Sequence, residues 1–242
     1  MVDSGQVTAT LRLSVGDFRI AHPMTVPVDA VPATAVVPVL QGLVNAVVEA
    51  AEERTSQMGK AISCRKGCGA CCRQLVPISR TEGERLLAVL DALPVERRAA
   101  VQARFAAADA ALAQSGLRDG LLDPEKRASK TDRELSTAYF ALGIACPFLE
   151  DESCSIHPER PLVCREYLVT SPAELCAGPA QEGVAPVPVP KLSAAARGLQ
   201  DETETWFPLA LLTAWSQARR ADPVNRTGPE WVQRFLKMLG SK

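Results

Sequence analysis

The chain has few histidines and no excess of charge of either sign. Its 242 residues include two His, and 27 Lys plus Arg stand against 28 Asp plus Glu, for a net charge of −1. A balance of this kind creates no global field that would attract nucleic acid or an anionic membrane surface. We therefore expect neither a nucleic-acid nor a membrane partner, and composition indicates no other partner.

The sequence also lacks a secretory signal and a long uninterrupted apolar run. Its first twenty residues contain no basic start followed by an apolar core. The most apolar stretch, 32–51, is interrupted by Pro38, Gln41, Asn45 and Glu49 before it reaches the roughly 20 apolar residues of a spanning helix. We expect no transmembrane segment and a cytoplasmic protein. Because cytosolic thiols are kept reduced, its cysteines favour metal ligation over disulfides.

What is present predicts a folded chain with a sizeable core, since 47% of the residues are apolar and 23% are charged. Apolar and polar residues alternate over 7–15, and Gly16-Asp17 can turn the chain into a second strand over 18–24. This N-terminal hairpin should pack on a helix predicted over 36–56.

Two further helices are predicted after the first cysteine group. Thr81 and Glu84 form a capping-box pattern for a helix that runs to Pro94, and a second helix starts at that proline and ends near Gly116. The polar segment 115–130 and the proline-containing segment 178–191 are predicted to be loops.

The expected fold class is mainly α, an α-rich α+β protein whose helical domain carries a loop-rich cysteine-cluster metal site beside a small N-terminal β-hairpin. The chain divides into a hairpin extension at 1–30, a helical metal-binding domain at 31–180, and a proline-rich strap with C-terminal helices at 181–242. Trp206, Trp215 and Trp231 lie in this last part at helical apolar spacing, which predicts that they anchor a core.

The clearest signal is the grouping of the eight cysteines. The first group lies in CRKGCGACC and the second runs through CPFLEDESCSIHPERPLVCREY and beyond: Cys64, Cys68, Cys71, Cys72, Cys146, Cys154, Cys164 and Cys176. Packing does not explain cysteines that recur at such short intervals beside glycine and charged residues. A loop that presents a thiolate every three or four residues brings them to one ion, and Gly67 and Gly69 would supply the left-handed backbone of a tight loop.

All eight cysteines are candidate metal ligands, but their partition is open. Cys71 and Cys72 are adjacent, and neighbouring side chains of an extended loop point apart, so the two should not bind the same ion. Eight thiols allow two four-thiolate sites, or one such site with thiols to spare. We expect at least one site to draw ligands from both groups.

Four basic residues surround the first group: Lys60, Arg65, Lys66 and Arg73. Their charge would lower the pKa of nearby thiols and offset the negative charge of a thiolate-bound metal. The alternative is an ordinary solvated surface run.

Taken together, CRKGCGACC, CPFL and CSIHPERPLVCREY resemble the YkgJ-type cysteine-cluster family, the CxxCxxCC family associated with zinc or iron chelation, over roughly residues 60 to 180. The resemblance implies metal or iron–sulfur binding through the cysteines and names no reaction. The same kind of domain occurs in flagellin lysine N-methylases, although this chain shows no Gly-rich turn after a strand that would cradle S-adenosylmethionine. The C-x3-C-x2-C spacing also occurs in radical enzymes that use that cofactor, but alternating strands and helices are missing here.

Three residues near the second group need separate treatment. His157 follows Cys154 by three positions, but the resemblance does not require His there, so an all-cysteine ligand set is favoured. Arg160 and Arg165 could donate hydrogen bonds to thiolate sulfur or to carboxylates such as Glu166, or could form ordinary ion pairs.

Three function classes follow from the sequence: an iron–sulfur protein in redox or metal handling, a zinc-stapled structural or interaction module, and a methyltransferase-like enzyme. Thiolate ligands suit zinc and iron–sulfur clusters alike. Eight cysteines with almost no histidine favour the iron–sulfur cluster over zinc as cofactor. The sequence contains no catalytic motif, so enzyme activity stays undecided.

Overall fold

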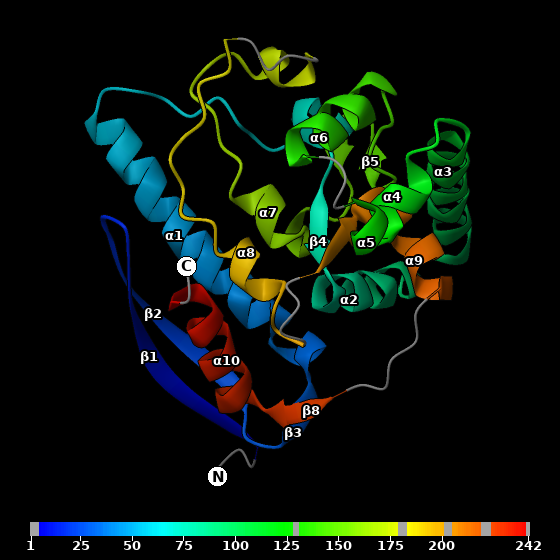
Figure 1. Cartoon of the computed structure of the whole chain (residues 1–242). Coiled ribbons are helices and arrows are strands. Elements are labelled where there is room, and N and C mark those ends of the chain that lie inside the picture. Colours follow the sequence, from blue (N-terminus) through cyan, green and yellow to red (C-terminus); the bar gives the residue numbers. More distant parts are fainter. Residues whose placement is uncertain (1–4, 128–130, 179–182, 201–204, 219–223, 241–242) are drawn as a thin grey trace.

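The computed structural model describes residues 5–127, 131–178, 183–200, 205–218 and 224–240, and it confirms an α-rich α+β fold with a small N-terminal hairpin. The cartoon in Figure 1 follows the chain from the hairpin, through the long helix α1 (Val37–Gln57), to the C-terminal helix α10 (Gly228–Gly240), which contacts the second strand of the hairpin. The described strands form four separate two-stranded antiparallel sheets: β1-β2, β3-β8, β4-β7 and β5-β6.

The hairpin consists of β1 (Gln6–Val15) and β2 (Phe18–Pro27), as predicted. Val15 pairs with Phe18 around the two-residue turn, where Gly16 has φ +53°. A side chain at this backbone angle would be strained, which explains the glycine. The apolar residues of β2 point inward, and this strand contacts both α1 and α10.

The longest helix, α1 (Val37–Gln57), follows the short 3-10 turn η1 (Ala33–Val36). Together, residues 33–57 are long and apolar enough to cross a membrane by length and composition, so the polar interruptions do not exclude a span as argued above. Half of the most apolar 18-residue stretch in this segment is buried inside the protein, and Leu43, Val44 and Val47 are among the buried residues. Packing within the core therefore accounts for the apolar composition of this helix.

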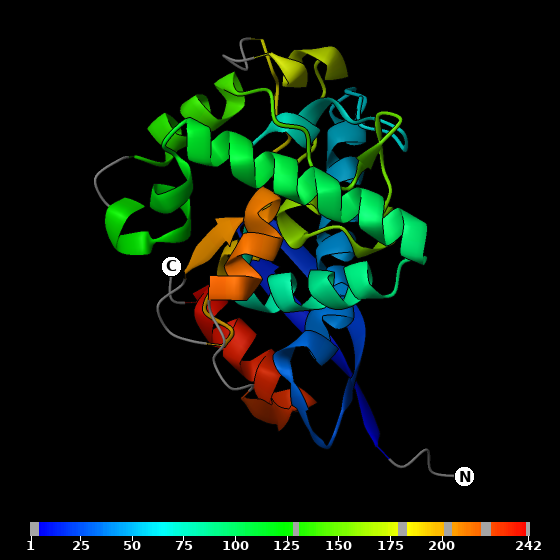
Figure 2. The same ribbon diagram turned by 90° about the vertical axis from the view of Figure 1, so that its right-hand side faces the viewer.

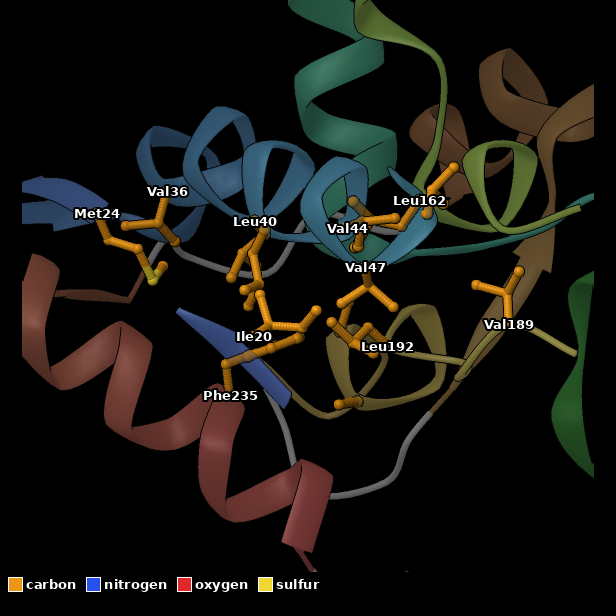
Figure 3. Close-up of a cluster of buried hydrophobic side chains, with 14 of the residues drawn as sticks. Ile20, Met24, Val36, Leu40, Val44, Val47, Leu162, Val189, Leu192 and Phe235 are labelled. Atoms are coloured by element: carbon orange, nitrogen blue, oxygen red, sulfur yellow. The ribbon is translucent and has the colours of Figure 1, made fainter. Parts of the chain in front are cut away.

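The main core lies between the hairpin, α1 and α10 (Figure 3). In that view Ile20 and Met24 of β2, Leu40 and Val47 of α1, and Phe235 of α10 gather in one cluster. The 21 buried residues of this cluster come from distant parts of the chain, including Leu162 and Val189. This core therefore joins the hairpin, the cysteine region and the C-terminal part.

The capping box of helix α2 (Arg80–Asp91) lies two residues earlier in the chain than predicted. Its capping box is formed by Ser79 and Glu82, whose carboxylate accepts from the Ser79 backbone amide at 3.0 Å, and not by Thr81 and Glu84. The sequence fits both pairs, but only Glu82 is buried where its other oxygen can accept from the amide of Leu162 at 2.9 Å. A tertiary contact thus selected the cap.

The next helices form a second layer, which Figure 2 shows with α3 (Val95–Gln114) lying across α2 and α9. The prediction of a loop over 115–130 is wrong for its described residues, because 118–122 form α4 and 124–127 form α5. Leu121 packs fully buried in a local core with Leu112, and this burial orders a segment whose composition is polar. Residues 128–130 lie outside the described part, and α6 (Asp132–Ala141) follows.

The C-terminal part is joined to the body by strand pairing. β7 (Trp206–Pro208) pairs with β4 (Pro77–Ser79), and β8 (Asn225–Thr227) pairs with β3 (Ala30–Pro32). Residues 183–191 of the strap form no regular element beyond one bridge between Val169 and Pro186, in line with the predicted loop, while 179–182 lie outside the described residues.

The three tryptophans behave differently from one another. Trp215 in α9 (Leu212–Ala218) and Trp231 in α10 (Gly228–Gly240) are buried on helices. Trp206 lies in a strand, so its predicted helical setting is wrong, and it is only partly buried beneath the guanidinium of Arg127, 3.9 Å above its ring. Strand pairing with β4 decided this local structure. The division at 1–30, 31–180 and 181–242 stays a prediction.

Candidate metal centre

The first cysteine loop depends on two glycines with different tasks. Gly67 has φ +86°, as a tight turn requires, and no atom lies within 4 Å of where a Cβ would stand. Gly69 has φ −99°, so the predicted left-handed angle is wrong there. It is needed because a Cβ would come within 2.7 Å of the backbone oxygen of Glu152. The loop is thus pressed against the turn that precedes Cys154.

Cys71 and Cys72 lie in the 3-10 helix η2 (Ala70–Arg73), and not in an extended loop. Both line the same cavity, and contact with the Cys72 thiol is the largest cause of the strongly raised pKa of Cys71. The expectation that these two side chains point apart is therefore wrong. Its premise was extended backbone, whereas a 3-10 turn rotates successive side chains by about a third of a turn.

In the second group, Cys154 is held by the hairpin of β5 (Leu149–Glu150) and β6 (Ser153–Cys154). The turn residues Asp151 and Glu152 have φ of 48° and 55°, an uncommon and strained conformation for residues other than glycine. Arg73 supports this turn, because its two terminal nitrogens donate to the two oxygens of Glu152 at 2.9 and 2.6 Å. A side chain of the first cysteine group thus holds the turn of the second.

Cys164 lies in the one-turn helix α7 (Leu162–Arg165), after the 3-10 turn η3 (His157–Glu159). Arg165 is buried and donates to the carbonyl of Arg160 at 3.0 Å, to Oδ1 of Asn45 at 2.9 Å and to the carbonyl of Pro158. Its predicted contact with thiolate or with Glu166 is wrong, because these backbone carbonyls use its donors. Arg165 instead fixes the path of the chain that leads to Cys164.

Besides the Arg73–Glu152 pair, three further hydrogen bonds join the two cysteine groups. The Cys146 amide donates to the carbonyl of Cys72 at 2.7 Å, and the side-chain amide of Gln74 donates to the carbonyl of Cys176 at 3.1 Å. The Ser63 amide, next to Cys64, donates to the carbonyl of Val169 at 2.9 Å. The two groups, about 80 residues apart in the sequence, therefore form one site.

The thiols gather around a cavity of about 180 Å³, called the inner cavity below. Phe148 and Ile156, which belong to a second hydrophobic core, form part of its wall. Six of the eight cysteines line it: Cys68, Cys71, Cys72, Cys146, Cys154 and Cys164. Pockets for organic ligands usually measure roughly 300–1,000 Å³, so this cavity suits an ion or a compact cluster better than a larger molecule.

Cys64 and Cys176 stand beside the inner cavity without lining it. Burial is the main cause of the raised pKa of Cys64, and Cys71, Cys176 and Cys68 add to it through their charges. The hydroxyl of Tyr167, which does line the cavity, lies 4.0 Å from Sγ of Cys176 and donates toward it. These two cysteines therefore lie close to the thiols of the first group.

Burial favours the neutral form of most of these thiols. It raises the pKa of Cys146 to about 12 and that of Cys164 well above its usual value. Cys71 adds to the raised pKa of five other cysteines: Cys64, Cys146, Cys154, Cys164 and Cys176. The thiol of Cys71 therefore lies near those of the other five cysteines. Because the neutral thiols are favoured, metal must displace protons when it binds at neutral pH.

Among the described residues, the guanidinium of Arg160 beside the thiols takes part in no ion pair. Arg160 lines the inner cavity, its Nε is buried without a hydrogen-bond partner, and its side chain forms no ion pair among the described residues. Its charge lowers the pKa of Cys71, Cys154 and Cys164, against the larger effects that raise them. His157 also lines the cavity, and burial together with Arg160 lowers its pKa.

The donor set fits a thiophilic metal or an iron–sulfur cluster by its chemistry, since six free thiols and a buried orphan N–H surround one small cavity. Within the described part of the chain, no three His, Cys, Asp or Glu side chains already converge at ligand distance. Side-chain rotation must therefore accompany binding.

Sequence reasoning placed the cysteines but missed their supports. Of the four basic residues around the first group, Arg73 pairs with Glu152, while Lys60, Arg65 and Lys66 are exposed and form no ion pair among the residues described. The Asp151-Glu152 turn has no glycine to reveal it. No spacing pattern in the sequence pointed to Gln74 or Tyr167, because both act by donating to Cys176, and that contact exists only in the folded chain.

Comparison with known proteins agrees with this geometry. Residues 63–182 match the model of the CxxCxxCC family, described as a "putative zinc- or iron-chelating domain". The matched segment contains all eight cysteines. No curated protein and no solved structure matches the chain.

Proposed function

The chain belongs to the CxxCxxCC family through residues 63–182, and on this premise we propose that it holds an iron–sulfur cluster through its clustered cysteines. We further propose that the loaded protein works in the cytoplasm in redox chemistry or metal handling. Such a cluster, when bound, accepts and donates single electrons at a potential tuned by its surroundings.

The observation that carries this proposal is the lining of the inner cavity, where three separate segments supply six cysteines. The first group contributes Cys68, Cys71 and Cys72, the β5–β6 region contributes Cys146 and Cys154, and α7 contributes Cys164. With Cys64 and Cys176 alongside, eight thiolate ligands are within reach of one centre, or of two centres around Cys71. Sulfur is the protein ligand that iron–sulfur clusters use.

Arg160 supports the same proposal. A guanidinium left without a carboxylate beside several thiols offsets the negative charge that those thiols acquire when they lose their protons. Its buried Nε–H would then donate to a thiolate or sulfide sulfur, as residues around metal ligands commonly do. Arg165 and the Arg73–Glu152 pair hold the two segments in place.

A zinc-stapled module is the second candidate, and one observation favours it. His157 lines the inner cavity beside Cys154, and the lowered pKa keeps its imidazole neutral, as metal ligation requires. A mixed Cys/His site is more typical of zinc than of a four-iron cluster. The methyltransferase alternative has no comparable support among the described residues.

Anaerobic purification of the full chain, followed by metal analysis and a visible spectrum, tests the proposal. We expect iron with acid-labile sulfide and a brown absorption, because zinc has a filled d shell and gives no visible band. A colourless protein with stoichiometric zinc would replace the first candidate with the second. A chain that binds neither metal after anaerobic reconstitution would end both.

A further inference from the structure

A second cavity lies on the other side of the first cysteine loop. This outer cavity is an open hollow of about 740 Å³, and its walls come from the chain before Cys64, the η2 turn and the 3-10 helix η4 (Ala173–Ala177). Three residues line both cavities: Arg65, Gly67 and Cys68. A single turn of backbone therefore separates the outer hollow from the inner cavity.

Cys68 is the cysteine that lines both spaces. Its turn is closed by a hydrogen bond from the Cys68 amide to the carbonyl of Arg65 at 3.1 Å. Gly67, which lines both cavities, has no atom within 4 Å of where its Cβ would be, so this turn is not tightly packed. A thiol in this position can meet a molecule in the outer cavity and then turn inward by side-chain rotation.

The charges around the outer cavity indicate what it would accept. Arg73 and Glu152 neutralise each other at 2.6 Å, whereas Arg65 and Glu174 form no ion pair within the described part of the chain. One free cation and one free anion in a hollow of this size suit a small zwitterionic molecule. A peptide thiol with an ammonium group and carboxylates has this chemistry.

We propose that Cys68 is the first acceptor of metal and takes it in the outer cavity from a complex with a low-molecular-weight peptide thiol. This inference rests on the proposed function. Cys68 Sγ forms a bond to the ion while one donor thiolate leaves it, and the Cys68 proton passes to that thiolate. No electron is transferred. Cys68 then turns to the inner cavity, where Cys71 and the remaining cysteines replace the other donor thiolates in the same way.

The test blocks the outer cavity without altering a cysteine. Ala177 is an exposed residue of the outer wall, so Ala177→Trp fills the hollow at little cost to packing, and Ala88→Trp on the exposed face of α2 is the matched control. The full chain, stripped of metal and reduced, is mixed with a cadmium–glutathione complex. Cadmium retained on the chain is measured at successive times after rapid desalting.

We expect Ala177→Trp to bind as much cadmium at equilibrium as the unaltered protein but to acquire it at least about fivefold more slowly, with Ala88→Trp unchanged. Wild-type loading rate in a folded Ala177→Trp variant overturns the inference and leaves the proposed function intact. Failure of the unaltered protein to retain any thiophilic metal at equilibrium would instead count against the proposed function.

Two cysteine variants give an independent reading. Both Cys68→Ser and Cys164→Ser should lower bound metal at equilibrium, because both are predicted ligands. Only Cys68→Ser should also remove the fast early uptake, since Cys164 lines the inner cavity and not the outer one. Equal early rates in the two variants would contradict the assignment of Cys68 as first acceptor.

Discussion

The main core and the inner cavity are built by the same chain in opposite ways. In the core, side chains from the hairpin, α1 and α10 pack against one another, and Leu43, Val47, Trp231 and Phe235 have no exposed surface. Around the inner cavity, six thiols and an unpaired guanidinium face an opening that the chain itself does not fill. The first region is complete without a ligand, whereas the second is arranged to receive one.

This contrast separates two sources of stability. Burial of apolar side chains stabilises the fold in the absence of any ligand. Metal ligation adds stability only when metal is present, because a ligand that binds the folded state alone shifts the folding equilibrium. Variants in the two regions should therefore differ in how their effects depend on metal.

The largest effect is expected in the main core. Phe235→Ala removes a ring without exposed surface from α10 and should lower the free energy of unfolding by about 3–5 kcal/mol. The loss should be the same in metal-free and metal-loaded protein when measured by urea denaturation. A loss confined to the loaded form would show that the two regions are not independent.

Glu166 should make the stability of the metal-free protein depend on pH. It follows Cys164 and accepts hydrogen bonds from the Ser193 amide and hydroxyl at 2.7 Å, near Lys191 and Glu82, and burial raises its pKa to about 7. Its neutral form is favoured in the fold, so its contribution is complete below its usual pKa of 4.5 and is lost as pH rises through 7.

Since a tenfold change in protonation equilibrium corresponds to about 1.4 kcal/mol, the loss should reach at most about 3.5 kcal/mol. Thermal unfolding of metal-free protein between pH 4.5 and 8 measures it. Glu166→Gln is the matched control, and it should flatten this profile. An unchanged slope in that variant would assign the pH effect to another group.

Cys164→Ser should destabilise the protein only when metal is present. Cys164 lines the inner cavity from α7, so its loss leaves the ligand set incomplete. At a free metal concentration of 100 times Kd, bound ligand contributes about 2.7 kcal/mol, and the variant should lose most of this together with metal per chain. Cys68→Ser should behave similarly at equilibrium. Full metal content in either variant would remove that residue from the ligand set.

Substitutions of Arg160 and Arg165 should differ in their effects, one on metal affinity and the other on the stability of the metal-free protein. Arg160→Gln should weaken metal binding by roughly 10- to 100-fold with little change in metal-free stability, because its Nε–H has no acceptor and its side chain forms no ion pair in the described part of the chain. Arg165→Gln should lower metal-free stability by about 1–3 kcal/mol, because the part-buried hydrogen bonds from this buried guanidinium to the carbonyls of Pro158 and Arg160 are lost. Competition titration and urea denaturation of both variants distinguish these roles.

The smallest effect is expected at His157. If the ligands are all cysteines, His157→Ala should change metal affinity less than about twofold, although this side chain lines the cavity. Metal analysis after dialysis measures the difference, with Cys164→Ser as the reference. Complete loss of metal in the histidine variant would establish a mixed Cys/His site and favour zinc.

Local patterns in the sequence predicted the elements whose periodicity is long and regular. The alternation over 7–15 and the apolar spacing over 36–56 correspond to β1 and α1, and Pro94 marks the start of α3. Predictions were wrong where a distant contact decides between local options. Leu162 selects Glu82 as the capping residue, β4 draws Trp206 into a strand, and buried Leu121 orders a segment predicted as a loop.

The sequence alone determined the chemistry of this protein, because side-chain identity and short spacing are local properties: eight thiols in two groups, too little histidine for an imidazole-rich site, and a match over residues 63–182 to a family described as a "putative zinc- or iron-chelating domain". Only the tertiary structure decided how that chemistry is arranged. It placed Cys71 among the other thiols and set Cys68 between two cavities. It also left Nε of Arg160 without an acceptor among the described residues, while Arg165 donates to backbone carbonyls. These outcomes depend on contacts between residues far apart in the chain, and burial and the competition for hydrogen-bond partners are settled only when those residues meet.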